Sequence, residues 1–364
     1  MRILFVLEHF HPYIGGVEFL FLQLGKELVR HGQEVTVITT RYDRSLENEE
    51  DIEGLKVIRI NAQSRYSFSL KAIPAIIKTL KNCDVVHTTT YNAAIPTWIA
   101  TRIIKKRCII TFHEYWGSLW NQLPYLNPVQ RVMYKTFEKI VSQLPFDRVV
   151  AVSDYTKNSL SNKGVPKHKL SRIYNGLDYS EFTIESSELE KNKTFIFVGR
   201  LGVSKGYDLL LPAIDKFLSH HPEYLFHMVI PRRPVGLFKT INKKIHSLNN
   251  RNRIKLFHHL PKEELKQFMM ASEFIIVPSY SEGFCFVAAE ACALNVPVLH
   301  SGRGALKEVV AGRNLSFSPF DEVGLLKGLE DAASAKWDNT PMKKFPIKNT
   351  IDAYMQLYLA PIHE

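Results

Sequence analysis

Short apolar runs alternate along the chain with segments whose apolar residues recur every three or four positions. Runs rich in Val, Ile and Phe without polar alternation are typical of strands buried on both faces of a parallel sheet. Eleven strands are predicted in this way, at 2–7, 34–39, 56–60, 84–88, 108–112, 148–152, 194–198, 225–230, 253–257, 274–277 and 297–299. Helices are predicted between them, at 17–31, 68–81, 92–106, 205–219, 262–271, 285–294 and 320–334. The pattern predicts an α/β fold with helices on both faces of parallel sheets.

The strands fall into two sets, separated by the polar stretch 179–193, which has no apolar period. A chain of 364 residues also exceeds the usual size of one domain. We therefore predict two doubly wound, Rossmann-like domains, at 1–180 and 190–345, facing a cleft. Ligands of open α/β sheets bind beyond the carboxyl ends of the strands, so the cleft is the predicted site.

Composition excludes several classes of protein. No window approaches the ~18 uninterrupted apolar residues that a membrane-spanning helix needs. The apolar run at 2–7 is interrupted by Glu8 and His9, too early for a signal peptide, so a cytoplasmic location is expected. The four cysteines form no C-x-x-C pair and are predicted to be buried apolar residues; they are Cys83, Cys108, Cys285 and Cys292.

The chain is basic, with 47 Lys and Arg against 36 Asp and Glu. Nine of these cations, and no acidic residue, lie in the segment 231–262, which predicts an anionic partner. Within it, 237–248 has the pattern of an amphipathic helix, whose apolar stripe is expected to pack on the second sheet. With the cations at 102–107, its lysines motivate a hypothesis of peripheral contact with an anionic membrane. Nucleic-acid binding is disfavoured, because the segment has few interleaved aromatic residues and matches no known motif.

Two loops of the first half carry candidate site residues. Gly15 and Gly16 stand where the first strand turns into a helix, so their amides suit an anion, although a plain flexible turn explains them equally. They do not form the dinucleotide motif G-x-G-x-x-G. His113 directly follows the strand 108–112 and is placed to reach the cleft; a lone histidine is more often structural. No H-E-x-x-H motif supports a metal.

Arg200 and Lys205 flank the turn after the strand 194–198. Two cations beside a helix N-terminus suit a diphosphate. The same turn contains G-x-S-x-G around Ser204, the nucleophile motif of α/β-hydrolases. In that motif the strand runs straight into the serine, whereas Arg200-Leu201-Gly202 intervene here, so a hydrolase is the weaker alternative.

The stretch Pro278-Ser279-Tyr280-Ser281-Glu282-Gly283-Phe284-Cys285-Phe286 is the most informative in the chain. Glu282 lies in a loop after a buried strand, and Glu290 lies eight residues later, in the following helix. Both carboxylates are predicted to lie along one ligand-facing edge, where they accept hydrogen bonds from sugar hydroxyls. The amides of 284–286, after Gly283, suit phosphate at the helix N-terminus. The alternative is a loop glutamate followed by a solvated helix glutamate.

This stretch resembles the family 4, or group 1, glycosyltransferases, whose motif is P-S-x-x-E-G-F-G followed by E-A. Four further motifs follow the family order along essentially the whole chain: Gly15-Gly16, Asn175-Gly176-Leu177-Asp178, Gly199-Arg200-Leu201 with Lys205-Gly206, and a last helix around 350–358. The resemblance implies the B-type architecture of two facing Rossmann-like domains. It also implies that the segment 346–364 crosses back onto the first domain.

The resemblance further implies retaining transfer of a hexose-type sugar from a nucleotide-diphosphate sugar, UDP- or GDP-linked. The acceptor is expected to be a glycan or a lipid-linked molecule, in surface polysaccharide or glycolipid synthesis. By the same resemblance, Arg200 and Lys205 hold the diphosphate, Glu290 binds the ribose, and Glu282 and His113 contact the sugar. No cofactor or metal is expected.

The chain departs from the family at four places, and two alternatives stay open. Cys285 stands where the family has glycine, and 231–236 replaces its G-x-G-P base-recognition loop. His113-Glu114 stands where the family has H-D or H-G, and Gly302-Arg303-Gly304 stands where it has a glycine pair. Acceptor contacts are predicted from two aromatic-rich loops, 61–72 and 115–128. A catalytically inactive relative that binds sugar nucleotides is an alternative, since a sequence does not show turnover; the hydrolase using Ser204 is another.

Overall fold

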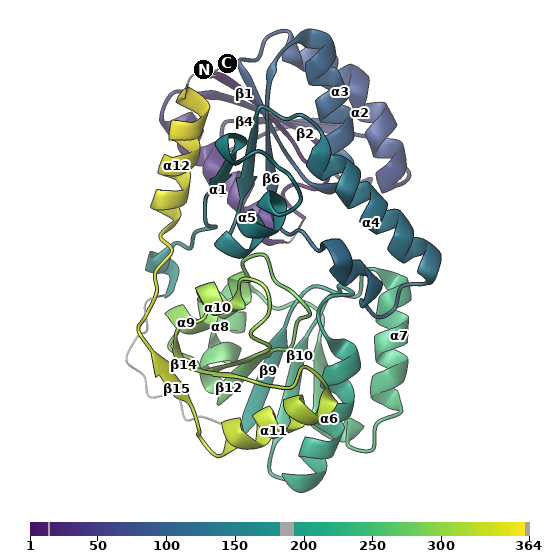
Figure 1. Cartoon of the computed structure of the whole chain (residues 1–364), viewed down its shortest axis with the longest axis vertical. Helices are drawn as coiled ribbons and strands as arrows, with labels where there is room; N and C mark the ends of the chain where they lie inside the picture. Colours follow the sequence, from purple (N-terminus) through teal and green to yellow (C-terminus); the bar gives the residue numbers. More distant parts are fainter. Residues whose placement is uncertain (14, 183–192, 361–364) are drawn as a thin grey trace. The chain divides into compact units, whose positions relative to one another are not determined.

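The computed structural model describes residues 1–13, 15–182 and 193–360 (Figure 1). The chain forms two compact units. The first contains Met1–Gly117, Met133–Gly176 and Ile347–Glu364, and the second contains Ser118–Val132 and Leu177–Pro346. The segment 118–132, expected in the first domain, therefore clusters with the second unit. Most of the expected linker, 183–192, lies outside the described residues.

The first unit is built on an eight-stranded sheet of order β3-β4-β2-β1-β5-β6-β7-β8. Its strands are β1 (Arg2–Val6), β2 (Glu34–Thr40), β3 (Glu49–Ile52), β4 (Leu55–Ile60), β5 (Val85–Thr89), β6 (Arg107–Phe112), β7 (Arg148–Ala151) and β8 (Leu170–Arg172). Neighbouring strands are parallel except β3 and β4. Because β2 and β5 pair on opposite sides of β1, the strand order reverses at β1 and β5. Such a switch point is where open sheets bind ligands.

Helices cover both faces of this sheet because side chains alternate along each strand. The helices of the unit are α1 (Gly16–Arg30), α2 (Arg65–Leu80), α3 (Ala94–Ile104), the greater part of α4 (Pro128–Gln143), α5 (Asp154–Ser161) and α12 (Ile347–Leu359). From β1, Ile3 and Phe5 pack into the cluster that includes α1 and α12. Leu4 and Val6 point the other way, into the cluster that includes α2.

The last helix, α12, is held to the first sheet by buried polar contacts. The Tyr358 hydroxyl lies 2.6 Å from Nδ1 of His87, and the Tyr354 hydroxyl lies 3.0 Å from Oγ1 of Thr111. Arg107 donates to the last carbonyls of the helix, including that of Leu357 at 2.7 Å. Those carbonyls have no partner within the helix, so the guanidinium caps its C-terminus.

The second unit is built on a seven-stranded sheet of order β11-β10-β9-β12-β13-β14-β15. Its strands are β9 (Thr194–Val198), β10 (Leu225–Val229), β11 (Ile254–Phe257), β12 (Phe274–Val277), β13 (Val298–His300), β14 (Gly312–Ser316) and β15 (Asp338–Thr340). Among the described strands of this second sheet, only β14 and β15 pair antiparallel. The strand order reverses at β9 and β12. The predicted α/β fold with two Rossmann-like sheets is confirmed. The bounds of each of the eleven predicted strands differ by at most one residue from those of an observed strand.

The helices of the second unit pack around an aromatic core. They are α6 (Tyr207–His220), α7 (Val235–His246), α8 (Lys262–Ala271), α9 (Phe286–Ala293), α10 (Leu306–Val309) and α11 (Glu322–Ala333). Phe195 of β9 stacks on Phe274 at 5.1 Å between ring centroids and contacts Phe217 edge to face. The apolar stripe of α7 packs on this core through Ile241 and Ile245, as expected from the sequence.

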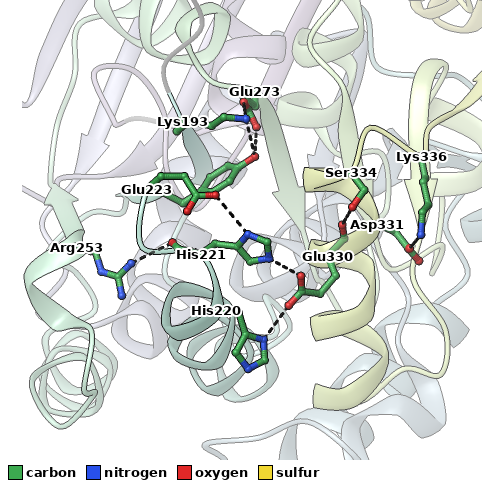
Figure 2. A network of polar contacts seen from close by, with 11 residues as sticks. Lys193, His220, His221, Glu223, Arg253, Glu273, Glu330, Asp331, Ser334 and Lys336 are labelled. Carbon is green, nitrogen blue, oxygen red and sulfur yellow. Dashed lines mark hydrogen bonds and ion pairs between the residues drawn. The ribbon is translucent and has the colours of Figure 1, made fainter.

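Polar contacts tie the C-terminal end of α6 to α11 (Figure 2). Nδ1 of His220 lies 3.0 Å from Oε1 of Glu330, and Nε2 of His221 lies 2.5 Å from Oε2 of the same carboxylate. His221 also stacks on Phe217. This network fixes the two helices together at the edge of the core. No helix in the described part of the chain combines the length and the apolar character that crossing a bilayer requires.

Candidate active site

The loops that follow β9 and β12 meet at the switch point of the second sheet. The amide of Tyr280 donates to the carbonyl of Ser204 at 2.7 Å, which joins the two loops. Gly206 adopts a φ of +72°, and a Cβ there would lie 2.1 Å from the carbonyl oxygen of Pro278. Only glycine meets both conditions. The close approach of these loops therefore depends on Gly206, the second glycine of the motif around Lys205.

Lys205 and Glu282 form an ion pair across these two loops. Nζ of Lys205 lies 2.7 Å from Oε1 of Glu282. The same oxygen accepts a hydrogen bond of 2.6 Å from the Ser279 hydroxyl. The Glu282 side chain is only 5% exposed, so its charge would be costly without these partners. Two residues separated by 77 positions are thus held in direct contact.

The backbone of Glu282 is fixed from a third loop. Gly304 has a φ of +64°, and a Cβ there would lie 2.4 Å from the carbonyl oxygen of Glu282. The amide of Ala305 donates to that carbonyl at 2.8 Å. Gly304 thus belongs to the site as a packing residue, although the sequence indicated only that Gly302-Arg303-Gly304 stands where the family has a glycine pair.

Arg200 lies in the same loop as Lys205 but is exposed. Its carbonyl accepts a hydrogen bond of 3.0 Å from the Tyr207 hydroxyl, which fixes the backbone where the loop enters α6. Among the residues that the structure describes, its guanidinium makes no ion pair. Arg200 is therefore the cation of this loop whose charge is not already matched by a carboxylate.

The start of α9 provides the predicted anion site of the second loop. Gly283 and Phe284 are buried, and Cys285 precedes the first helical residue, Phe286. Cys285 has a φ of +76°, a conformation that glycine adopts freely and other residues rarely. The amides of the first turn have no partner within the helix and carry the positive end of its dipole. The family's glycine at this position is therefore explained by the backbone, which keeps the same conformation with cysteine.

Glu290 lies one turn further along α9 and is partly exposed. Desolvation raises the pKa of its carboxyl group to about 7, while the nearby Lys262 acts to lower it. No described residue donates a hydrogen bond to this carboxylate. The structure places Glu290 on the helix that follows the Glu282 loop, as predicted.

Ser204 is buried, and its position differs from that of a hydrolase nucleophile. β9 ends at Val198, six residues before the serine. Its carbonyl accepts the hydrogen bond from Tyr280 that joins the two loops. The described contact of Ser204 therefore joins two loops and does not indicate a nucleophile.

At the switch point of the first sheet, Glu8 is a buried residue that the sequence did not single out. Its carboxylate accepts hydrogen bonds from Nε of Arg65 and Nδ2 of Asn92, both at 3.0 Å. Burial acts to raise its pKa, but the charge and hydrogen bonds of Arg65 and the hydrogen bond of Asn92 hold the pKa below its usual value. The position of Glu8 directly after a strand was the available signal. Arg65 begins α2, so the predicted acceptor loop 61–72 is helical from that residue onward.

Gly15 and Gly16 lie at the start of α1 in the same unit. Gly15 precedes the helix in an extended conformation, with φ of −179°, and Gly16 is the first helical residue. The loop before them is anchored by Arg59, whose Nη2 donates to the carbonyl of His11 at 2.8 Å. The two glycines thus lie at a helix N-terminus, as predicted.

His113 follows β6 and is partly buried. Burial, together with the nearby His113, lowers the pKa of His87 to about 3, so His87 is neutral. The segment after His113 is held by Glu138 of α4, whose two carboxylate oxygens accept hydrogen bonds from the amides of Trp116 at 2.9 Å and Gly117 at 2.7 Å. Glu138 was not predicted, because its contacts lie more than 20 residues away in the sequence.

The structure thus gathers most of the predicted residues at two sheet edges. Lys205 and Glu282 are in contact, and Arg200 and Glu290 lie on the same two segments of the second unit. Gly15, Gly16 and His113 follow strands of the first unit. In the described part of the chain, no three His, Cys, Asp or Glu side chains are arranged to hold a metal ion.

Two family models match consecutive parts of the chain. One, described as Glycosyltransferase Family 4, matches residues 14–181, and the other, Glycosyl transferases group 1, matches residues 180–334. The chain belongs to the group 1 glycosyltransferases. The resemblance seen in the sequence is confirmed, and with it the general activity of glycosyl transfer.

The relatives of this glycosyltransferase are distant but match most of its length. An uncharacterized glycosyltransferase of Methanocaldococcus jannaschii is 26% identical over 341 residues, which cover 85% of this chain and 83% of that protein. GDP-mannose:cellobiosyl-diphosphopolyprenol alpha-mannosyltransferase of Xanthomonas campestris is 24% identical over 311 residues, covering 82% and 78%.

Solved structures show the same fold. Sucrose-phosphate synthase of Thermosynechococcus elongatus superposes on this glycosyltransferase with a TM-score of 0.82, at 21% identity, and covers 98% of both chains. The Anabaena protein HepE, solved in complex with UDP-glucose, has a TM-score of 0.76 at 17% identity and covers 98% of this chain and 99% of its own.

Proposed function

We propose that this glycosyltransferase moves a hexose-type sugar from a nucleotide-diphosphate sugar to a glycan or lipid-linked acceptor, with retention of the anomeric configuration. The observation that carries the proposal is the ion pair between Lys205 and Glu282 at the switch point of the second sheet. It puts a cation for phosphate and a carboxylate for sugar hydroxyls side by side. Arg200, on the same loop, adds a cation whose charge is not matched by a carboxylate.

In the proposed mechanism, Arg200 and Lys205 bind the diphosphate of the donor. As the bond to the sugar breaks, negative charge grows on the leaving diphosphate, and fixed cations stabilise it most at that point. The first-turn amides of α9, near Gly283 and Phe284, add to this stabilisation. These groups supply the electrostatic stabilisation that the reaction requires, and we propose that it proceeds without a metal or a cofactor.

Two carboxylates, of Glu282 and Glu290, are proposed to orient the transferred sugar and the ribose of the donor. Glu282 is proposed to accept a hydrogen bond from a hydroxyl of the transferred sugar, with Lys205 keeping the carboxylate in place. Glu290 is proposed to bind the ribose hydroxyls. From the first unit, His113 is proposed to contact the transferred sugar, a role that rests on the family resemblance.

The names of similar proteins support the class of donor and acceptor. The Anabaena structure contains UDP-glucose, and the Xanthomonas enzyme is named for GDP-mannose and a diphosphopolyprenol-linked acceptor. We propose a UDP- or GDP-linked donor, and an acceptor used in surface polysaccharide or glycolipid synthesis. With a lipid-linked acceptor, the protein works from the cytoplasm at the inner face of a membrane.

Ligand-induced thermal stabilisation identifies the base. UDP, GDP, ADP and CMP are compared at equal concentration, and either UDP or GDP is expected to raise the melting temperature most. The Arg200→Ala variant is expected to lose this shift. A shift that stays unchanged in this variant contradicts its role in diphosphate binding.

Turnover decides between an enzyme and an inactive relative. The nucleotide sugar with the preferred base is incubated with the protein, and release of the nucleoside diphosphate is followed with and without acceptor. Proton NMR of the product is expected to show the anomeric configuration of the donor. Binding of the nucleotide without release of diphosphate supports the inactive relative, and an inverted product contradicts retention.

A further inference from the structure

Helix α2 of the first unit carries apolar side chains on its solvent-facing side as well as on its core-facing side. Tyr66, Leu70 and Ile73 recur at the spacing that places side chains on one side of a helix. Leu70 is 75% and Tyr66 57% exposed. The opposite face is buried in the sheet and consists of Phe68, Ala72, Ile76 and Leu80. The exposed side chains of Tyr66 and Leu70 therefore lie outside this core-facing side.

The neighbouring helices α3 and α4 extend this apolar surface. α2 and α3 pack side by side, as Figure 1 shows. Trp98 of α3 and Phe137 of α4 pack against the same hydrophobic cluster. Ile103 of α3 is 59% exposed, and Met133 and Ile140 of α4 are also exposed. We call the exposed side chains Tyr66, Leu70, Ile103, Met133 and Ile140 the apolar face of the first unit.

Lysines accompany the apolar face. Six of them are exposed on or beside the three helices: Lys71, Lys78, Lys81, Lys105, Lys135 and Lys139. None of the six makes an ion pair with a described residue. Asp84 is the only acidic residue between 65 and 105, and Glu138 of α4 binds the amides of Trp116 and Gly117. The surface is therefore apolar and positively charged at once.

The basic segment of the second unit is different. On α7, Lys239, Lys243 and Lys244 are exposed, but Ile241 and Ile245 are buried in the core. Its lysines attract an anionic surface, but Val235, at 54%, is the one exposed large apolar side chain on this helix. Firm attachment to a bilayer needs apolar side chains at the acyl boundary as well as cations at the headgroups. The first unit supplies both.

We propose that the apolar face of the first unit docks on a bilayer that contains anionic phospholipid, with its lysines among the headgroups. Lysine is depleted in protein–protein interfaces, so six lysines around an apolar surface favour lipid over a protein partner. The purpose of this docking, which is to bring the enzyme to a lipid-linked acceptor, rests on the proposed function. Vesicle binding itself is measured without turnover.

The test is flotation of the whole protein with phosphatidylcholine vesicles, with and without phosphatidylglycerol, at low and at physiological salt. The wild type is expected to float only with phosphatidylglycerol, and less at the higher salt. The K78E/K135E/K139E variant is expected to lose about tenfold or more in vesicle affinity, because each lysine near an anionic surface contributes. The L70S/I103S variant is expected to lose a similar amount while keeping its melting temperature, because both side chains are exposed.

The matched control is K239E/K243E/K244E on α7, which makes the same change in net charge on the second unit. Its affinity is expected to fall much less. A wild type that does not float, an L70S/I103S variant that floats normally, or an α7 variant that loses as much as K78E/K135E/K139E each overturns the proposal. Transfer to a water-soluble acceptor without flotation removes the docking proposal alone. Flotation without turnover of any nucleotide sugar leaves it standing and removes the proposed function.

Discussion

Nζ of Lys205 lies 2.7 Å from Oε1 of Glu282, and this ion pair joins the loops after two adjacent strands of the second sheet. The pair has both a structural and a chemical consequence. It holds a buried carboxylate beside its cation at a sheet edge where a sugar is proposed to bind. It also fixes the position of the ammonium that is proposed to meet the diphosphate.

Removing one partner of this pair is predicted to destabilise the second unit. Lys205→Ala leaves Glu282 buried without its cation and should cost about 3 kcal/mol of unfolding free energy. Adding Glu282→Gln to that variant removes the uncompensated charge, so the double variant should be more stable than Lys205→Ala alone. Urea unfolding of the wild type, both single variants and the double variant gives the coupling energy. Strictly additive effects would show that the contact contributes nothing.

Gly206 and Gly304 are predicted to be irreplaceable because a backbone carbonyl lies where a Cβ would be. Alanine at Gly206 or Gly304 would place a Cβ 2.1 Å from the Pro278 carbonyl or 2.4 Å from that of Glu282. Either substitution should move the Lys205 or Glu282 loop and lower transfer activity by about a hundredfold, since small displacements at a reacting centre have effects of this size.

The control for these variants is Gly32→Ala. Gly32 has a φ of +74° but nothing within 4 Å of a Cβ, so it isolates backbone strain from collision. It should reduce stability by about 1–2 kcal/mol and leave activity intact. Activity that is equally low in all three variants would argue against a specific packing role.

Most strands were predictable because they are buried and therefore apolar. The elements that were not predicted lack such a buried apolar pattern. The eleven predicted strands are runs rich in Val, Ile, Leu or Phe, whereas the four strands that were not predicted carry no such signal. Of these four, β3, β8 and β15 lie at sheet edges, and β14 reads Gly-Arg-Asn-Leu-Ser. The helix α4 was missed because Met133 and Ile140 face solvent, so its apolar residues do not mark a core face.

The places of the proposed site residues in the fold were predictable, but their contacts were not. Arg200, Lys205 and Glu282 lie in loops after strands of the second sheet, and Glu290 lies in the helix that follows, which local patterns indicate. The direct bond between Lys205 and Glu282 requires the pairing of β9 beside β12, which is a property of the whole sheet. The same holds for Glu8 in the first unit, whose partners Arg65 and Asn92 are 57 and 84 positions away.

Glu290 is predicted to make stability fall as the pH rises. Its pKa is raised by desolvation from 4.5 to about 7, so the folded protein binds this proton more tightly than the unfolded chain. A proton held preferentially by the folded state stabilises it at low pH, and that contribution is lost between about pH 4.5 and 7. The difference in unfolding free energy between Glu290→Gln and the wild type should therefore shift in favour of the variant when the pH is raised from 5 to 8.

Urea unfolding of both proteins at several pH values measures this difference. Glu264→Gln on α8, where the carboxylate is exposed, is the matched control and should show no such trend. A difference between Glu290→Gln and the wild type that does not vary with pH would contradict the raised pKa.

Cys285 is predicted to strain the start of α9. Its φ of +76° costs an L-residue about 1–2 kcal/mol, part of which glycine returns through its greater freedom in the unfolded chain. Cys285→Gly should therefore be more stable than the wild type by about 0.5–1 kcal/mol. Cys285→Ala keeps a Cβ and should bring no such gain, so thermal unfolding of the two variants separates backbone strain from loss of the thiol.

Glu138 is predicted to support the His113 segment without taking part in donor binding. Its carboxylate accepts hydrogen bonds from the amides of Trp116 and Gly117, just after His113, and such charge-assisted bonds are roughly twice as strong as neutral ones. Glu138→Gln keeps the size of the side chain but loses the charge and one acceptor, so the segment should loosen. The expected result is a kcat lower by about ten- to hundredfold with little change in the KM for the nucleotide sugar, because the loops proposed to bind the donor belong to the second unit. Thr136→Ala, at an exposed position of the same helix, should leave both parameters unchanged. Steady-state kinetics with varied donor measure the split, and a rise in the donor KM with an unchanged kcat would assign Glu138 to binding instead.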